Sequence, residues 1–234
     1  PESTRPLSLA DTFNKLVANT IRIALERVAT NRISFYQRGF LKGRQVLDNV
    51  VELDFFAHIC SMISPNAALV LFDFRAAFPS VSHKFLWMIM EMSGLPTQLI
   101  TLIRCLYRNC THIIRIGGKR FNGPRLLSGV RQGCPLSGLL FAIAMEPILR
   151  RISYAIGPQC SLRAYADDVG IVLMNFMLVL GSLGAAFHCI GEGTGLNLNV
   201  SKTIFIPLWP VCNKKQLTNL IREIWPAWRD MIIS

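Results

Sequence analysis

Two adjacent acids, Asp167 and Asp168, interrupt an otherwise apolar stretch of the chain. Residues 161–165 precede them and residues 169–173 follow, a pattern that predicts a strand, a short acidic turn and a second strand. Neighbouring carboxylates repel and raise each other's proton affinity, and a bound divalent cation removes that cost. The pair therefore indicates a β-hairpin whose tip can hold a hard metal ion through oxygen ligands.

A third acid favours the metal site over a turn that is merely polar, since Asp is also a common turn residue. Residues 67–74 are almost continuously apolar, which is typical of a strand buried on both faces, and they include Asp73. If this strand lies beside the hairpin, Asp73, Asp167 and Asp168 converge. Such a cluster can hold two Mg²⁺ ions about 3.5 to 4 Å apart, as in phosphoryl transfer.

The formal net charge of +11 indicates a polyanionic partner, because Lys and Arg gain affinity for nucleic acid by releasing counterions. Between Met92 and Met145 there is no Asp or Glu, which is unusual for a solvated surface. We interpret the cations of this stretch as a nucleic-acid track. Its members are Arg104, Arg108, Arg115, Lys119, Arg120, Arg125 and Arg131.

Two helices are predicted before the Asp73 strand, over about residues 10–29 and 45–61, the first from its apolar periodicity. Three arginines lie largely off the apolar stripe of the first helix, which fits a solvated face and a nucleic-acid face equally well. Between the helices, residues 37–44 contain two glycines that allow tight turns and three cations that could meet phosphates.

After the Asp73 strand, Ser82 is predicted to cap a helix, and a second helix ends near Arg108. Residues 113–127 indicate a hairpin, and residues 129–137 a glycine-punctuated loop that leads into a helix from about Pro135. In that loop Gln132 could touch a base or a sugar, or the glycines could serve only the turn. A strand over residues 204–207 and a helical element over residues 214–228 follow.

Residues 169–191 carry no formal charge and are long enough to span a bilayer. Polar residues and glycines interrupt the run, so we predict a strand followed by a buried helix over about residues 176–190. A membrane helix is the alternative, and no stable membrane association is expected. The seven cysteines lack CxxC spacing, which indicates neither a zinc site nor a disulfide framework and favours a reducing, intracellular compartment.

Six segments, in this order, resemble the reverse transcriptase of non-LTR (LINE-type) retrotransposons: residues 5–9, 37–44, 71–81, 129–137, 165–168 and 195–202. The resemblance implies an α+β, right-hand polymerase fold whose thumb is largely absent. Residues 1–66 would form the fingers. Residues 67–206 would form the palm, an antiparallel sheet backed by helices, with inserted helices and a basic hairpin over residues 82–128. Residues 207–234 would begin the connection to the thumb, and the sequence is expected to be a fragment of a longer polyprotein with further modules.

The implied activity is RNA-directed DNA polymerisation, with an RNA template, a DNA primer and dNTPs as partners. Two Mg²⁺ ions, with Mn²⁺ as an alternative, would be held by Asp73, Asp167 and Asp168, together with the backbone carbonyl of Phe74. Lys202 matches the lysine that acts as general acid toward pyrophosphate. The resemblance also implies an intracellular location, in the nucleus or in a ribonucleoprotein particle.

Nucleotide-binding residues follow from the same resemblance. Phe78 would stack under the sugar and exclude a 2′-hydroxyl, so that deoxynucleotides are preferred. Gln132 and Gly133 would line the nucleotide and template side, and Arg44 and Lys42 would contact the incoming phosphates.

Two departures from the family pattern support an alternative. The chain has Ala-Ala-Phe-Pro over residues 76–79 where the family commonly has Lys-Ala-Phe-Asp, and Gly138 where the family commonly has Pro. The alternative is a decayed, catalytically inactive retroelement fragment that only binds nucleic acid. An RNA-dependent RNA polymerase is disfavoured, because Phe78 would obstruct a ribonucleotide and because that class usually has Gly immediately before the paired acids.

Overall fold

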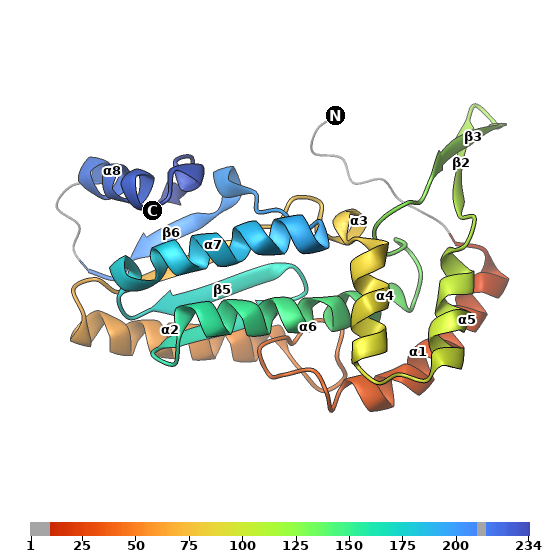
Figure 1. Cartoon of the computed structure of the whole chain (residues 1–234), viewed down its shortest axis with the longest axis horizontal. Coiled ribbons are helices and arrows are strands. Elements are labelled where there is room, and N and C mark those ends of the chain that lie inside the picture. The colour runs from red at the N-terminus through yellow and green to blue at the C-terminus, as the bar shows by residue number, and fades with distance from the viewer. Residues whose placement is uncertain (1–9, 210–213) are drawn as a thin grey trace.

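The computed structural model describes residues 10–209 and 214–234 of the 234-residue chain. Helices cover both faces of a five-stranded sheet, and a separate two-stranded ribbon projects from this body (Figure 1). The predicted α+β fold class is therefore confirmed. The segment 5–9 and Cys212 lie outside the described residues.

The sheet has the strand order β4-β5-β1-β6-β7. Its strands are β1 (Ala68–Phe72), β4 (Cys160–Tyr165), β5 (Asp168–Leu173), β6 (Ile204–Pro207) and β7 (Ile232–Ile233). The first four strands of this order pair antiparallel, as expected, whereas β7 pairs parallel with β6 at the edge. The parallel edge was not predicted, because two residues are too few to show an alternating pattern.

The predicted helices occur in the predicted order with small shifts at their ends, where helix boundaries are least well determined by sequence. The four-residue helix over Ala77–Ser80 was not predicted. The helices are α1 (Thr12–Ala29), α2 (Val46–Ile63), α3 (Ala77–Ser80), α4 (His83–Met92), α5 (Thr97–Tyr107), α6 (Ser137–Ile156), α7 (Phe176–Thr194) and α8 (Lys214–Ile224). The ribbon consists of β2 (Thr111–Ile116) and β3 (Lys119–Arg125). Short 3₁₀ turns cover Val200–Lys202 and Pro226–Trp228. The predicted cap is present: the Ser82 hydroxyl accepts from the Phe85 N–H at 3.5 Å.

Alternate residues of β1 enter two different hydrophobic clusters, as expected for a strand covered on both faces. Val70 and Phe72 belong to the main core with α6 and α7, whereas Leu69 packs on the smaller cluster that Ala57 and Cys60 of α2 form. The position of β1, and of the residue that follows it, is therefore fixed from both sides.

Helix α2 lies against the back of the sheet (Figure 1). The approach is close at Gly170 of β5, where an added Cβ would lie 2.7 Å from a methyl carbon of Leu53. The division of the chain at residue 66 into fingers and palm stays a prediction. Helix α2 belongs to the part predicted as fingers, yet it packs against the five-stranded sheet.

Helix α7 is long and apolar enough to cross a membrane by length and composition. Its side chains Leu180, Leu183, Phe187 and Ile190 are buried and belong to the main core. The predicted buried helix is therefore confirmed, and it extends to Thr194.

Candidate active site

The pairing of β1 with β5 brings the three predicted acids to one end of the sheet. Phe72 pairs with Val169, so Asp73 follows at the register position beside Asp168. Tyr165 pairs with Asp168, which leaves Ala166 and Asp167 as the two-residue turn between β4 and β5. The backbone thus gathers acids that are almost a hundred residues apart in sequence.

The donor chemistry of this edge suits a hard divalent cation, because all three side chains offer carboxylate oxygens. Within residues 10–209 and 214–234, however, no three His, Cys, Asp or Glu side chains form a group that could hold a metal ion. The structure therefore places the three acids at one end of the sheet without arranging their carboxylates as a ligand cluster.

A second segment lies along the Asp73 backbone. The N–H of Asn199 donates to the carbonyl of Asp73 at 2.7 Å, and the N–H of Arg75 donates to the carbonyl of Asn197 at 2.9 Å. These bonds flank Phe74 and do not use its carbonyl, which was predicted to bind metal. Lys202 is exposed in the 3₁₀ turn that ends this segment, so it lies on the same stretch that contacts Asp73.

Phe78 is half-buried between two aromatic rings. It stacks on Phe141 of α6, with ring centroids 4.4 Å apart and planes at 7°, and it meets Phe40 edge-on at 5.6 Å. Its carbonyl accepts from the N–H of Val130 at 2.8 Å. The loop that follows Val130 is therefore attached to the Phe78 segment. In this loop Gln132 is half-buried and Gly133 is exposed.

Arg44 is directed into its own loop rather than toward a ligand. Its two terminal nitrogens donate to four carbonyls, those of Thr30, Ile33, Ser34 and Gln37, at 2.5 to 3.1 Å. Burial lowers the pKa of the guanidinium. Four of its five N–H donors are thus used within the protein, whereas Lys42 is exposed. The phosphate contacts predicted for both residues stay predictions.

The nucleic-acid track divides into two groups. Arg104 forms an ion pair with Glu91 at 2.6 Å, and the Arg131 guanidinium lies over the Tyr107 ring at 5.1 Å. The other members are exposed, and no carboxylate of the described residues pairs with any of them: Arg108, Arg115, Lys119, Arg120 and Arg125. Four of these five lie on the projecting ribbon (Figure 1).

Two cations face each other on this ribbon. Arg115 and Arg120 are directly opposite in the β2–β3 register, a pairing that destabilises a hairpin when both residues are charged. A polyanion on that face would relieve the repulsion.

Gln37 is the residue of this site that the sequence did not single out. Its buried side chain forms hydrogen bonds with both backbone groups of Ala166, beside Asp167. Only the cations and glycines of residues 37–44 were interpreted, because the partner of Gln37 is 129 positions away and no local pattern indicates it.

A protein-family model described as "Reverse transcriptase (RNA-dependent DNA polymerase)" matches residues 1–220 of the chain. A Retrovirus-related Pol polyprotein from the type-1 retrotransposable element R2 of Nasonia vitripennis is 30% identical over 178 residues, which are 72% of this chain and 17% of that protein. The transposon TX1 uncharacterized 149 kDa protein of Xenopus laevis is 29% identical over 74% of this chain and 14% of that protein. The chain thus spans less than a fifth of the length of either relative.

Solved structures of telomerase share the fold. In the complex of Candida tropicalis telomerase with a TWJ fragment of telomeric RNA, the protein superposes on 83% of this chain with a TM-score of 0.61 and 13% sequence identity. This match covers 33% of the telomerase chain. Another solved structure, apo telomerase of the same organism, gives a TM-score of 0.60.

Proposed function

The chain belongs to the reverse transcriptase (RNA-dependent DNA polymerase) family, and from this premise we propose that it carries the catalytic core of an RNA-directed DNA polymerase. The resemblance to non-LTR retrotransposon enzymes is confirmed by its R2 relatives. The observation that carries the proposal is the register that sets Asp73 beside the Asp167–Asp168 hairpin.

Asp73, Asp167 and Asp168 would hold two Mg²⁺ ions, or Mn²⁺ in their place. When bound, such ions lower the pKa of the primer 3′-hydroxyl and bind the triphosphate of the incoming dNTP. Three carboxylates at one edge are the oxygen donors that this chemistry requires.

The remaining predicted residues would act around that centre. Lys202 would donate a proton to the leaving pyrophosphate, which its place beside the Asp73 segment supports. Phe78, held in place by Phe141, would occupy the position of a 2′-hydroxyl and select deoxynucleotides. Gln132 and Gly133 would line the template side.

The exposed members of the nucleic-acid track would contact the phosphates of the RNA template and DNA primer. Their freedom from carboxylate partners among the described residues supports this part of the proposal. Further modules of a longer polyprotein, and a nuclear or ribonucleoprotein location, stay predictions.

Primer extension on an RNA template tests the proposal. We expect Mg²⁺-dependent incorporation of dNTPs, and we expect Asp167→Asn to lower it by at least about a hundredfold, since a metal ligand is lost. Asp54→Asn is the matched control, because Asp54 is exposed on α2. Incorporation that survives Asp167→Asn would show that the site is wrongly assigned.

A second candidate is an inactive fragment that binds nucleic acid without catalysis. It is favoured by Pro79, which stands where the family commonly has an acid, and by the lack of a grouped ligand set within residues 10–209 and 214–234. This candidate predicts salt-sensitive RNA binding with no Mg²⁺-dependent incorporation.

A further inference from the structure

We infer that Gln37 is a positioning residue, which fixes the backbone of the Ala166–Asp167 turn and thereby the direction of the Asp167 side chain, one of the proposed ligands of the divalent cation. The inference rests on the proposed function, because it assigns a role relative to the proposed metal site.

The side-chain amide of Gln37 is fully buried and directed at the turn. Its Oε1 accepts from the Ala166 N–H at 2.9 Å and from the Gly39 N–H at 2.7 Å, and its Nε2 donates to the Ala166 carbonyl at 3.0 Å. One side chain thus satisfies both backbone groups of Ala166, as a paired strand would.

The bonded residue has an unfavourable backbone conformation. Ala166 has a φ of 57°, in the left-handed region that residues with a Cβ rarely adopt. It immediately precedes Asp167, so the direction in which the Asp167 side chain leaves the backbone depends on this conformation. The two hydrogen bonds between Gln37 and Ala166 stabilise this conformation.

Gln37 is itself held against the edge of the sheet. The Ala164 N–H donates to the Tyr36 carbonyl at 2.7 Å and the Arg38 N–H donates to the Ala164 carbonyl at 2.9 Å, so Gln37 forms a parallel β-bridge with Ala164 of β4. At Gly39 an added Cβ would lie 2.2 Å from the Ala166 nitrogen. Only a glycine permits this approach.

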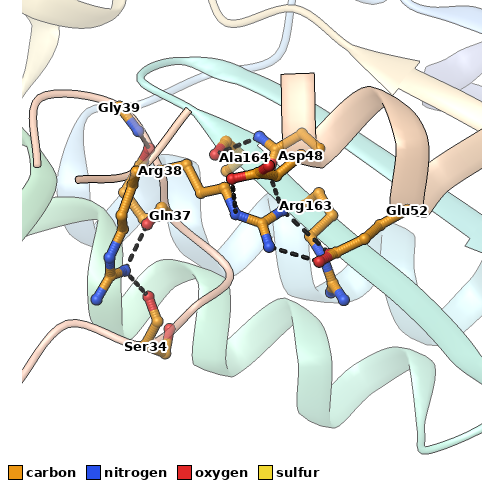
Figure 2. A network of polar contacts seen from close by, with 10 residues as sticks. Ser34, Gln37, Arg38, Gly39, Asp48, Glu52, Arg163 and Ala164 are labelled. Atoms are coloured by element: carbon orange, nitrogen blue, oxygen red, sulfur yellow. Dashed lines mark hydrogen bonds and ion pairs between the residues drawn. The ribbon is translucent and has the colours of Figure 1, made fainter. Parts of the chain in front are cut away.

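A polar network anchors the same segment to α2 and β4 (Figure 2). The Arg38 guanidinium contacts Asn49 at 2.7 Å and Glu52 at 2.6 Å, and Glu52 also accepts from Arg163. Asn49 in turn donates to the Ala164 carbonyl at 2.9 Å. The loop cannot leave the turn without breaking these bonds.

The segment also reaches the proposed sugar-selecting residue. Phe40 contacts the Phe78 ring and lies so close to Gly138 that an added Cβ there would be 2.6 Å from the Phe40 ring. The same five-residue stretch, 36–40, therefore contacts the Ala166–Asp167 turn through Gln37 and the Phe78 ring through Phe40.

Cation binding by the purified chain tests the inference without requiring catalysis. Mn²⁺ is titrated into the protein, and the signal of unbound Mn²⁺ is followed by electron paramagnetic resonance. We expect Gln37→Met, which has a similar length and no hydrogen bonds, to weaken Mn²⁺ binding by about tenfold, the usual effect of losing a residue that orients a metal ligand. Asp167→Asn should abolish binding.

Asn49→Ala is the matched control, because it removes a buried amide of the same network that contacts Ala164 and not Ala166. It should leave Mn²⁺ affinity near that of the unaltered chain, even where it lowers the melting temperature as much as Gln37→Met. Equal Mn²⁺ affinities of Gln37→Met and Asn49→Ala would overturn the inference. If Gln37→Met does not fold, Gln37→Glu, which keeps the acceptor and loses the donor, takes its place in the same comparison.

If the unaltered chain binds no Mn²⁺, the proposed metal site is wrong. Amide hydrogen exchange then tests separately whether Gln37 stabilises the turn. The Ala166 N–H should exchange at least about tenfold faster in the Gln37 variant than in Asn49→Ala. Equal exchange rates would overturn the positioning role.

Discussion

Gly129 connects the loop of Gln132 to the segment that follows Asp73. Its N–H donates to the Val81 carbonyl at 2.7 Å, and its backbone passes so near to Pro79 that an added Cβ would lie 2.4 Å from the proline Cα. Its φ of 80° is also left-handed. Both the conformation and the space at this position require glycine.

Gly129→Ala should therefore destabilise the protein more than a left-handed glycine elsewhere does. Gly157→Ala is the control, because Gly157 has a φ of 75° and no atom within 4 Å of the added Cβ. In Gly157→Ala we expect the free energy of unfolding to fall by about 1 kcal/mol, because of the backbone conformation alone. In Gly129→Ala we expect a further fall of about 1 to 3 kcal/mol. Urea unfolding of both variants measures the difference, and equal losses would show that the Pro79 contact relaxes without cost.

At the residue scale, the sequence predicted the convergence of the three acids, and it did not predict the contacts of Arg44 and Gln37. Asp73 and the paired acids were found because a charge in an apolar strand is conspicuous. Arg44 was interpreted as a phosphate ligand, since a formal charge does not reveal whether its partner is an anion or a set of carbonyls. Gln37 carries no charge and pairs with a distant residue, so nothing local indicated it.

The β2–β3 ribbon is the element on which cations collect without acids. Its residues are almost all exposed, and Arg115 and Arg120 face one another across it. Such a ribbon is suited to contact a nucleic-acid backbone, because both cations can bind phosphates.

Replacing Arg115 and Arg120 together by Gln should weaken RNA binding and flatten its salt dependence, because fewer counterions are released. We expect the slope of log K against log salt to fall by about 1 to 2. The control replaces Arg222 and Arg229, which lie at the far end of the chain, and lowers the net charge equally. Equal effects from both pairs would mean that binding senses only the total charge.

At the element scale, helices and hairpins were predicted well because their hydrophobic periods are local. The predicted helix ends differ from the observed ones by a few residues, and the β6 strand and both hairpins are where the patterns placed them. The side of the sheet on which α2 packs was not predictable. It depends on the fit of Leu53 over Gly170, which joins distant parts of the chain.

Across the whole molecule, Glu52 joins three parts of the fold: its own helix α2, the 36–40 segment through Arg38, and β4 through Arg163. The hydrogen bond from Arg38 is the main cause that lowers the Glu52 pKa from its ordinary 4.5 to about 2. The carboxylate is about two-fifths exposed, so solvent screens part of its contribution.

This lowered pKa predicts how stability responds to acid. A carboxyl whose pKa is depressed by folding stabilises the protein above its ordinary pKa, and that contribution is lost as the pH falls through the folded value. Glu52→Gln should therefore reduce the melting temperature at neutral pH, and the difference from the unaltered chain should shrink between about pH 4.5 and pH 2. Asp48→Asn is the control, since Asp48 reaches Arg38 only at 4.0 Å. A pH-independent difference would contradict the assignment.

The division of β1 between two hydrophobic clusters limits where natural variants can carry insertions and deletions. Deleting one residue inside β1 would exchange its side chains between the two clusters and pull Asp73 back from the hairpin. Insertions and deletions should therefore be excluded from this strand during divergence. They should accumulate instead at the tip of the ribbon, where Gly117 and Gly118 would have no atom within 4 Å of an added Cβ.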